Sequence, residues 1–207
     1  MAYSDFTLAT VQQQFQLRIA EQHNLFPDLP PVAVSPILRS TLDETIPLAL
    51  AIHTEKARSE LIIAPLLVEV RRLLDKQISL FSGIDFTIAP EQGLNGVCDY
   101  ILARSPEQLF LQAPVMMIVE AKNENIKGGL AQCIAAMVAA QRFNEQASNP
   151  IAAIGGAVTT GNVWRFLLLA DQTVTIDKRE YYINRVDEIL AVLVYVAGGT
   201  IVTTVSN

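Results

Sequence analysis

The stretch Val115-Met-Met-Ile-Val-Glu-Ala-Lys122 carries an unbroken apolar run that ends in a carboxylate and an ammonium group two positions apart. Five consecutive apolar residues between polar neighbours are typical of a strand covered on both faces in the middle of an α/β sheet, although a buried helix segment has the same pattern. Pro114 favours a strand start here. Because side chains alternate across a strand, Glu120 and Lys122 are predicted to lie on one face and to share one site.

Composition limits the class of protein. The chain has 207 residues, of which 51% are hydrophobic and 17% are charged. Such a chain is long enough to bury a full core, so we expect a single domain over 1–207. Its formal net charge of −6 argues against a broadly basic nucleic-acid-binding surface but is compatible with a local basic groove.

The cysteines and the two ends of the chain lack targeting or metal-binding patterns. Cys98 and Cys133 stand singly in apolar surroundings, which favours buried, reduced thiols in a cytoplasmic protein. The first residues do not combine a basic region with an apolar core, so no secretory signal is expected. The apolar segment 189–205 falls short of the roughly 20 continuous apolar residues of a membrane span. We predict a buried terminal helix followed by a strand or tail, and no membrane association.

Hydrophobic periodicity predicts an alternation of helices and strands after a mainly helical start. A proline-rich connector over 24–35 excludes regular hydrogen-bonded structure there, and a loop is expected over 123–129. Helices are predicted over 4–22, 37–52, 55–76, 130–147 and 188–196, the last capped by Asp187, and strands over 78–81, 84–88, 97–103, 115–122, 151–159, 163–169 and 174–176.

Glu60 stands in line with an apolar helix face. The residues of that face step by four, three and four positions, and extending it backwards by three positions reaches Glu60. The face consists of Ile63, Leu67, Val70 and Leu74. A carboxylate at this position either needs a buried partner or lies at the solvated end of the stripe, and periodicity leaves both open. Pro65 predicts a kink or a break near Leu61.

Two further polar residues occupy positions of interest. Asp99 shares a strand face with Val97 and Ile101, which marks it as inward-facing. Gln132 falls in the first turn of the alanine-rich helix that follows the opening strand, although it could equally be exposed. One inward acid is commonly a structural hydrogen-bonding residue, whereas several in one fold favour a site.

The order Glu60, Asp99, Glu120-x-Lys122 and Gln132 resembles the PD-(D/E)XK phosphodiesterase superfamily, the restriction-endonuclease-like nucleases. The resemblance covers residues 55–170. It implies an α/β fold with a central mixed β-sheet flanked by helices in the order α-β-β-β-α-β. A helical extension over 1–54 would precede this core, and a strand and helix over 171–207 would follow it. Two departures are Cys98, where the name-giving motif has proline, and Ala136, where some branches have tyrosine.

The resemblance also implies roles for these residues. Asp99 and Glu120 would hold Mg²⁺ or Mn²⁺, Glu60 would complete the metal site, and Lys122 would help position or activate the attacking water. Gln132 matches a helix glutamine found in several branches. A hard cation suits phosphodiester hydrolysis because it generates a nucleophile from water and neutralises the charge of the transition state. The expected partner is DNA, and the resemblance also allows a homodimer. Candidate DNA contacts are Arg58, Arg71, Arg104, Lys127, Arg142 and Arg165.

Two other interpretations remain open. The acidic balance of the chain favours a nuclease fold that is retained as a nucleic-acid or protein binding module without catalysis. Alternatively, the acids pair with Lys122 and arginines inside an ordinary core. In that case the carboxylates of Asp99 and Glu120 would point apart by more than about 8 Å, a separation too great for sharing one ion.

Overall fold

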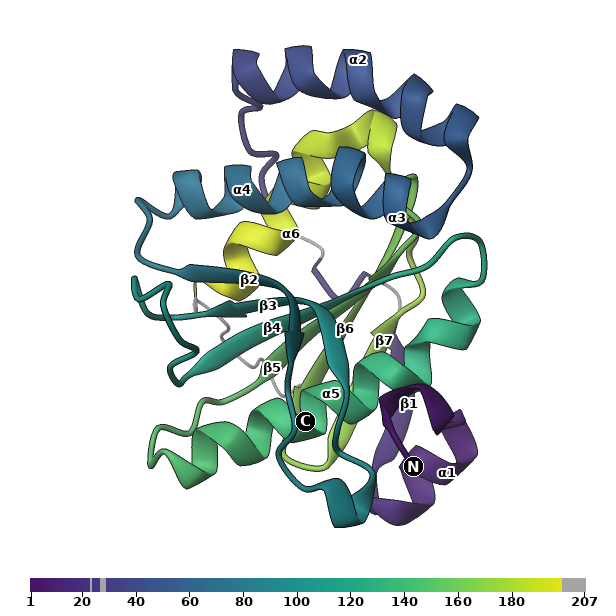
Figure 1. Ribbon diagram of the computed structural model, residues 1–207, viewed down its shortest axis with the longest axis vertical. Coiled ribbons are helices and arrows are strands. Elements are labelled where there is room, and N and C mark those ends of the chain that lie inside the picture. The colour runs from purple at the N-terminus through teal and green to yellow at the C-terminus, as the bar shows by residue number, and fades with distance from the viewer. Residues whose placement is uncertain (23, 27–28, 199–207) are drawn as a thin grey trace.

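The apolar run singled out in the sequence forms strand β4 (Val115–Ala121), and every one of its residues is buried. A computed structural model describes residues 1–22, 24–26 and 29–198 and places β4 near the middle of a mixed sheet (Figure 1). The sheet has the strand order β1-β7-β6-β5-β4-β3-β2, and β8 pairs with β6 beside this path. The predicted α/β class, with a central mixed sheet flanked by helices, is confirmed.

The strands combine parallel and antiparallel pairs. β4 is antiparallel to β3 and parallel to β5, β1 is parallel to β7, and the remaining neighbours are antiparallel. The other strands are β1 (Arg18–Gln22), β2 (Ser79–Asp85), β3 (Val97–Ala103), β5 (Ile154–Thr159), β6 (Val163–Ala170), β7 (Thr173–Asp177) and β8 (Tyr181–Tyr182).

Helices cover both faces of the sheet, and each face has its own hydrophobic core. In Figure 1 the long helix α5 and the short α1 lie on one side, while α2, α4 and α6 lie on the other. The helices are α1 (Leu8–Gln14), α2 (Pro36–Ile52), α3 (Glu55–Arg58), α4 (Ala64–Leu73), α5 (Ile126–Gln146) and α6 (Val186–Ala197). Burial on both faces explains why β4 consists almost entirely of apolar residues.

The predicted helix over 4–22 is wrong in its second half. Helix α1 ends at Gln14, and Gln16 adopts a left-handed conformation with φ 53°. The chain then enters β1, which pairs in parallel with β7 and places Arg18 opposite Thr173. Because β7 lies far along the chain, no local pattern of residues 4–22 indicates this pairing. The N-terminal region therefore contributes a strand to the central sheet.

The predicted helix over 55–76 is present but is interrupted where Pro65 indicated. A π-helical segment, Ser59–Ile63, joins α3 to α4. Pro65 has no N–H to donate to the carbonyl of Leu61, and the hydroxyl of Thr45 donates to that carbonyl instead, at 2.6 Å. The wider turn shifts the phase of the helix between Glu60 and the apolar face that follows it.

Several element boundaries differ from the predictions. The predicted strands 78–81 and 84–88 form one strand, β2, in which Gly83 has φ 63°. Helix α5 begins at Ile126, inside the predicted loop, because the side chain of Asn125 caps it by accepting from Gly128 N. Helix α6 begins at Val186, so Asp187 lies within its first turn and does not cap it.

Other expectations concern the cysteines and the C-terminus. Cys98 and Cys133 are buried and unpaired, as predicted. Within the described part of the chain, no helix is both long enough and apolar enough to cross a membrane. The buried terminal helix is present as α6, whereas the strand or tail predicted after it falls on 199–207, outside the described residues.

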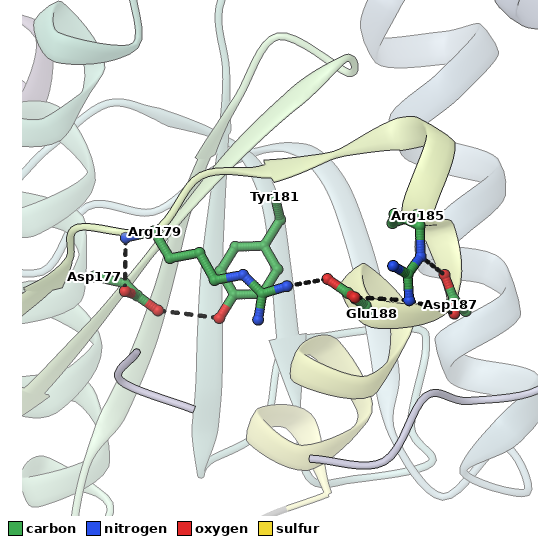
Figure 2. A network of polar contacts seen from close by, with 6 residues as sticks. All are labelled: Asp177, Arg179, Tyr181, Arg185, Asp187 and Glu188. Carbon is green, nitrogen blue, oxygen red and sulfur yellow. Dashed lines mark hydrogen bonds and ion pairs between the residues drawn. The ribbon is translucent and has the colours of Figure 1, made fainter. Parts of the chain in front are cut away.

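A polar network joins the end of β7 to β8 and α6 (Figure 2). The buried carboxylate of Asp177 accepts hydrogen bonds from Arg179 N at 2.9 Å and from the hydroxyl of Tyr181 at 3.1 Å. The guanidinium of Arg179 lies over the ring of Tyr181 and donates to Glu188 on α6. Asp177 also accepts from Leu25 N at 3.2 Å, so the connector before α2 is fastened at the same point.

Candidate active site

The site forms where strands β3 and β4 separate at their ends. Their backbone register extends to Tyr100, opposite Val119. One residue further along β3, Asp99 reaches across with its side chain, and its Oδ2 accepts the backbone N–H of Ala121 at 2.8 Å. A side-chain oxygen therefore takes the place of a backbone carbonyl. This arrangement brings a carboxylate between the two strand ends.

Glu120 and Lys122 lie on the same face, as the alternation of β4 predicts. Lys122 Nζ donates to Glu120 Oε1 at 2.6 Å and to Gln132 Oε1 at 3.2 Å. Glu120 is buried with 2% of its surface exposed, whereas the Lys122 side chain retains 21%. Gln132 belongs to α5, so this helix orients the ammonium group from the side. The structure thus brings together three of the five predicted site residues around one ammonium group.

The fourth residue, Asp99, is close enough to Glu120 to influence its ionisation. Burial and the charge of Asp99 together raise the pKa of Glu120 to about 8, although Lys122 acts to lower it. Burial lowers the pKa of Lys122, but the carboxyl groups of Glu120, Glu55 and Asp99 raise it above its ordinary value, so Lys122 remains an ammonium group. Two neighbouring carboxylates repel each other, and a bound cation would relieve this repulsion.

This proximity contradicts one of the open interpretations. If the acids were ordinary core residues, the carboxylates of Asp99 and Glu120 were expected to point apart by more than about 8 Å. Continuing the register of β3 and β4 by one residue instead places Asp99 opposite Glu120, and its charge is close enough to raise the pKa of the Glu120 carboxyl. The pairing of Glu120 with Lys122 leaves Asp99 to face the other carboxylate and the Ala121 amide.

Glu60, the fifth predicted residue, is separate from the acid pair. Its carboxylate forms an ion pair with Lys56 Nζ at 3.3 Å, and 61% of its side chain is exposed. The periodicity left open whether Glu60 has a buried partner or lies at the solvated end of the stripe, and the structure shows the solvated position. The π-helical segment rotates Glu60 away from the line of the buried face. Glu60 nevertheless lines the same cavity as Asp99.

That cavity lies between α3 and the sheet, beside Ser82 and Gly83 in the middle of β2, Asp99 of β3 and Ala121 at the end of β4. It has a volume of about 260 Å³. Gly83 lies between Ser82 and Ile84, whose β3 partners flank Asp99. A Cβ atom added at Gly83 would meet nothing within 4 Å, so this side of the cavity is open. The cavity is lined by Glu55, Lys56, Ser59, Glu60, Ser82, Gly83, Asp99, Tyr100 and Ala121. Of the predicted site residues, Asp99 and Glu60 therefore line the cavity, whereas Glu120 and Lys122 lie behind its lining.

The donor set fits a hard cation that keeps several of its own water ligands. Asp99 and Glu120 supply adjacent carboxylate oxygens, the ligand type that Mg²⁺ and Mn²⁺ prefer, and Mg²⁺ is commonly held by only one or two carboxylates. Across residues 1–22, 24–26 and 29–198, no three His, Cys, Asp or Glu side chains form a group that could hold a metal ion by themselves. The pair would therefore need water or substrate oxygens to complete the coordination.

Most of the basic residues considered for DNA contact have partners within the chain. Arg71 donates to Ile78 O, Arg165 donates to Asp177 O, and Arg142 donates to Gln92. Arg58 is buried among neutral acceptors. Arg104 and Lys127 are exposed. These two side chains are the candidates that remain accessible to a polyanion.

Sequence reasoning did not identify Ser59 and Tyr100, which close the inner wall of the cavity. The hydroxyl oxygens of Ser59 and Tyr100 lie 2.7 Å apart, and the Tyr100 hydroxyl also donates to Ser59 O at 2.9 Å. Tyr100 directly follows Asp99, but it stands in an apolar strand pattern, which predicts a core residue at this position. Comparison with family models and with curated proteins found no match for this chain.

Proposed function

We propose that this chain is a divalent-metal-dependent nuclease of the PD-(D/E)XK type that hydrolyses DNA phosphodiester bonds. The observation that carries the proposal is the placement of the Asp99 carboxylate opposite Glu120, whose own carboxyl group is bonded to the Lys122 ammonium. Burial and the charge of Asp99 oppose the ionisation of Glu120, and a bound cation would relieve that opposition. The position of the pair at the ends of two central strands gives it rigid support.

The role of each residue would follow from its charge. Asp99 and Glu120 would hold Mg²⁺ or Mn²⁺, which when bound supplies an activated water and a counter-charge for the phosphoryl oxygens. Lys122 would orient the attacking water and stabilise developing negative charge, with its ammonium held in place by Gln132. Glu60 would act from the cavity wall, through water or substrate, because its carboxylate is paired with Lys56.

A binding module without catalysis is the second candidate. It is favoured by the ring of acids around the cavity, Glu55, Glu60 and Asp99, and by the intramolecular partners of Arg71, Arg142 and Arg165. Such a module would not require a cation at the acid pair. Metal binding therefore separates the two candidates.

The test is cleavage of plasmid and linear DNA by the purified chain with Mg²⁺ or Mn²⁺. We expect Asp99→Ala and Lys122→Ala each to lower the rate by about 10²-fold or more, because each removes a charge acting on the transition state. The matched control is Asp43→Asn, which removes an exposed acid on α2 and should leave the rate unchanged. Activity that survives both site changes would refute the assignment.

Calorimetric titration with Mn²⁺ provides a readout independent of cleavage. We expect binding in the wild-type chain and in Asp43→Asn, and loss of binding in Asp99→Asn. At a Mn²⁺ concentration of 100 times Kd, bound metal should also raise the free energy of unfolding by about 2.7 kcal/mol. Mn²⁺ binding without DNA cleavage would refute the proposed catalysis but keep the metal site, and the absence of both would favour the binding module.

A further inference from the structure

Arg58 is a buried guanidinium next to the candidate site. Only 6% of its surface is exposed, and its bonds go to neutral acceptors. It donates to Asn123 Oδ1 at 3.2 Å, to Thr160 O at 3.1 Å and to His53 Nδ1 at 3.3 Å. Burying a permanent cation costs free energy. A buried guanidinium is therefore stable only where its N–H groups donate to well-placed acceptors.

The acceptors of Arg58 lie on segments that carry the site. Asn123 directly follows Lys122, and Thr160 directly follows the last residue of β5. The backbone of Lys122 is itself bonded to β5, because its N–H donates to Thr159 O at 2.8 Å. One guanidinium therefore holds the ends of β4 and β5 together from outside the sheet.

Arg58 also belongs to the helical wall of the cavity, which faces the strands. It is the last residue of α3, whose Glu55 and Lys56 line the cavity wall. On the inner side, the contact of Ser59 with Tyr100 fastens the same wall to β3. The wall is thus attached to the sheet at two points, one on β3 and one beyond the ends of β4 and β5.

We infer that Arg58 is a positioning residue, which fixes the separation between the α3 wall and the strand end that carries Lys122. This inference rests on the proposed function, because the separation matters to a phosphodiester bound at Asp99. A guanidinium suits the role because its planar fork donates in several fixed directions, whereas a lysine ammonium is a point charge on a flexible stem. Arg58→Lys therefore keeps the charge and loses the geometry.

The test compares Arg58→Lys with the wild-type chain in cleavage kinetics and in hydrogen exchange. We expect kcat to fall by about 10-fold or more with little change in KM, because a misplaced strand end weakens transition-state contacts. We also expect the Lys122 amide to exchange about 10-fold faster, since its bond to Thr159 is less well held. Asn123→Ala, which removes one acceptor from the other side, should change both in the same direction by a smaller factor.

The matched control is Arg179→Lys, which alters a guanidinium that also joins separate elements, through Tyr181 and Glu188 (Figure 2). It should leave kcat and the exchange of Lys122 unchanged. A lower melting temperature in Arg58→Lys with wild-type kcat and exchange would reduce Arg58 to a stabilising residue and overturn the inference. If the wild-type chain cleaves no DNA, the proposed function fails, and exchange at Lys122 alone decides whether Arg58 holds the strand end.

Discussion

Two buried carboxylates at strand ends, Asp177 and Glu120, have opposite surroundings. Asp177 ends β7 with none of its surface exposed, and it accepts from Leu25 N, Arg179 N and the Tyr181 hydroxyl. Glu120 is the next-to-last residue of β4, with one ammonium donor and with the charge of Asp99 nearby. Both positions show an acid at the end of a strand with apolar residues, so sequence pattern alone does not distinguish them.

The difference indicates which acid serves the fold and which is available for chemistry. At Asp177, neighbouring donors satisfy the charge, and several segments depend on it for their attachment. At Glu120, burial and a like charge oppose ionisation, which is characteristic of functional sites. The following changes test this contrast.

The largest effect is expected for the pH dependence of stability. Because the pKa of Glu120 is raised from 4.5 to about 8, the native state keeps a proton that the unfolded chain loses. The contribution of this group to the free energy of unfolding therefore falls as pH rises between about 4.5 and 8, by on the order of 5 kcal/mol. Glu120→Gln should flatten this decline in urea denaturation measured from pH 5 to 9. If the free energy of unfolding had the same slope against pH in the wild type and the variant, burial and Asp99 would not oppose the ionisation of Glu120 in the native state.

A smaller loss is expected at the other acid. Asp177→Asn removes the charge and presents an amide group to donors, which leaves at least one buried N–H or hydroxyl unpaired. We expect the free energy of unfolding at pH 7 to fall by about 3 kcal/mol. Urea denaturation beside Asp43→Asn, an exposed acid, gives the comparison. A loss no larger than that of the control would remove the distinction drawn for Asp177.

The smallest effect is expected when one donor is removed and the carboxylate remains. Tyr181→Phe deletes the hydroxyl that donates to Asp177, while both backbone N–H donors stay in place. The expected loss is about 1 kcal/mol, the usual net value of one hydrogen bond. The same denaturation assay measures it. A loss as large as that of Asp177→Asn would mean that Tyr181 alone satisfies the buried charge.

Parts of the site could be predicted because they depend on neighbouring residues in one strand. The shared face of Glu120 and Lys122 follows from alternation, and the bounds predicted for the strand 97–103 match β3. The contact of Asp99 with Glu120 could not be predicted in this way. It depends on where β3 and β4 stop pairing, which is decided by the Asp99 side chain reaching the Ala121 amide.

Glu60 and Arg58 illustrate what local patterns miss. The stripe that led to Glu60 assumed one uninterrupted helix, whereas the π-helical segment before Pro65 changes the phase. The acceptors of Arg58 lie far along the chain, so nothing near Arg58 distinguishes it from a solvated arginine. Strand β1 was missed for the same reason, since its partner is β7.

By itself, the sequence determined the buried central strand, the charged pair at its end and the alternation of helices and strands around it. These features follow from period and burial, which are properties of neighbouring residues. Only the tertiary structure decided that Asp99 meets Glu120, that Glu60 stands apart, and that Arg58 ties the cavity wall to the strand ends. Each of these depends on a hydrogen bond or an ion pair whose geometry is set by packing between distant segments.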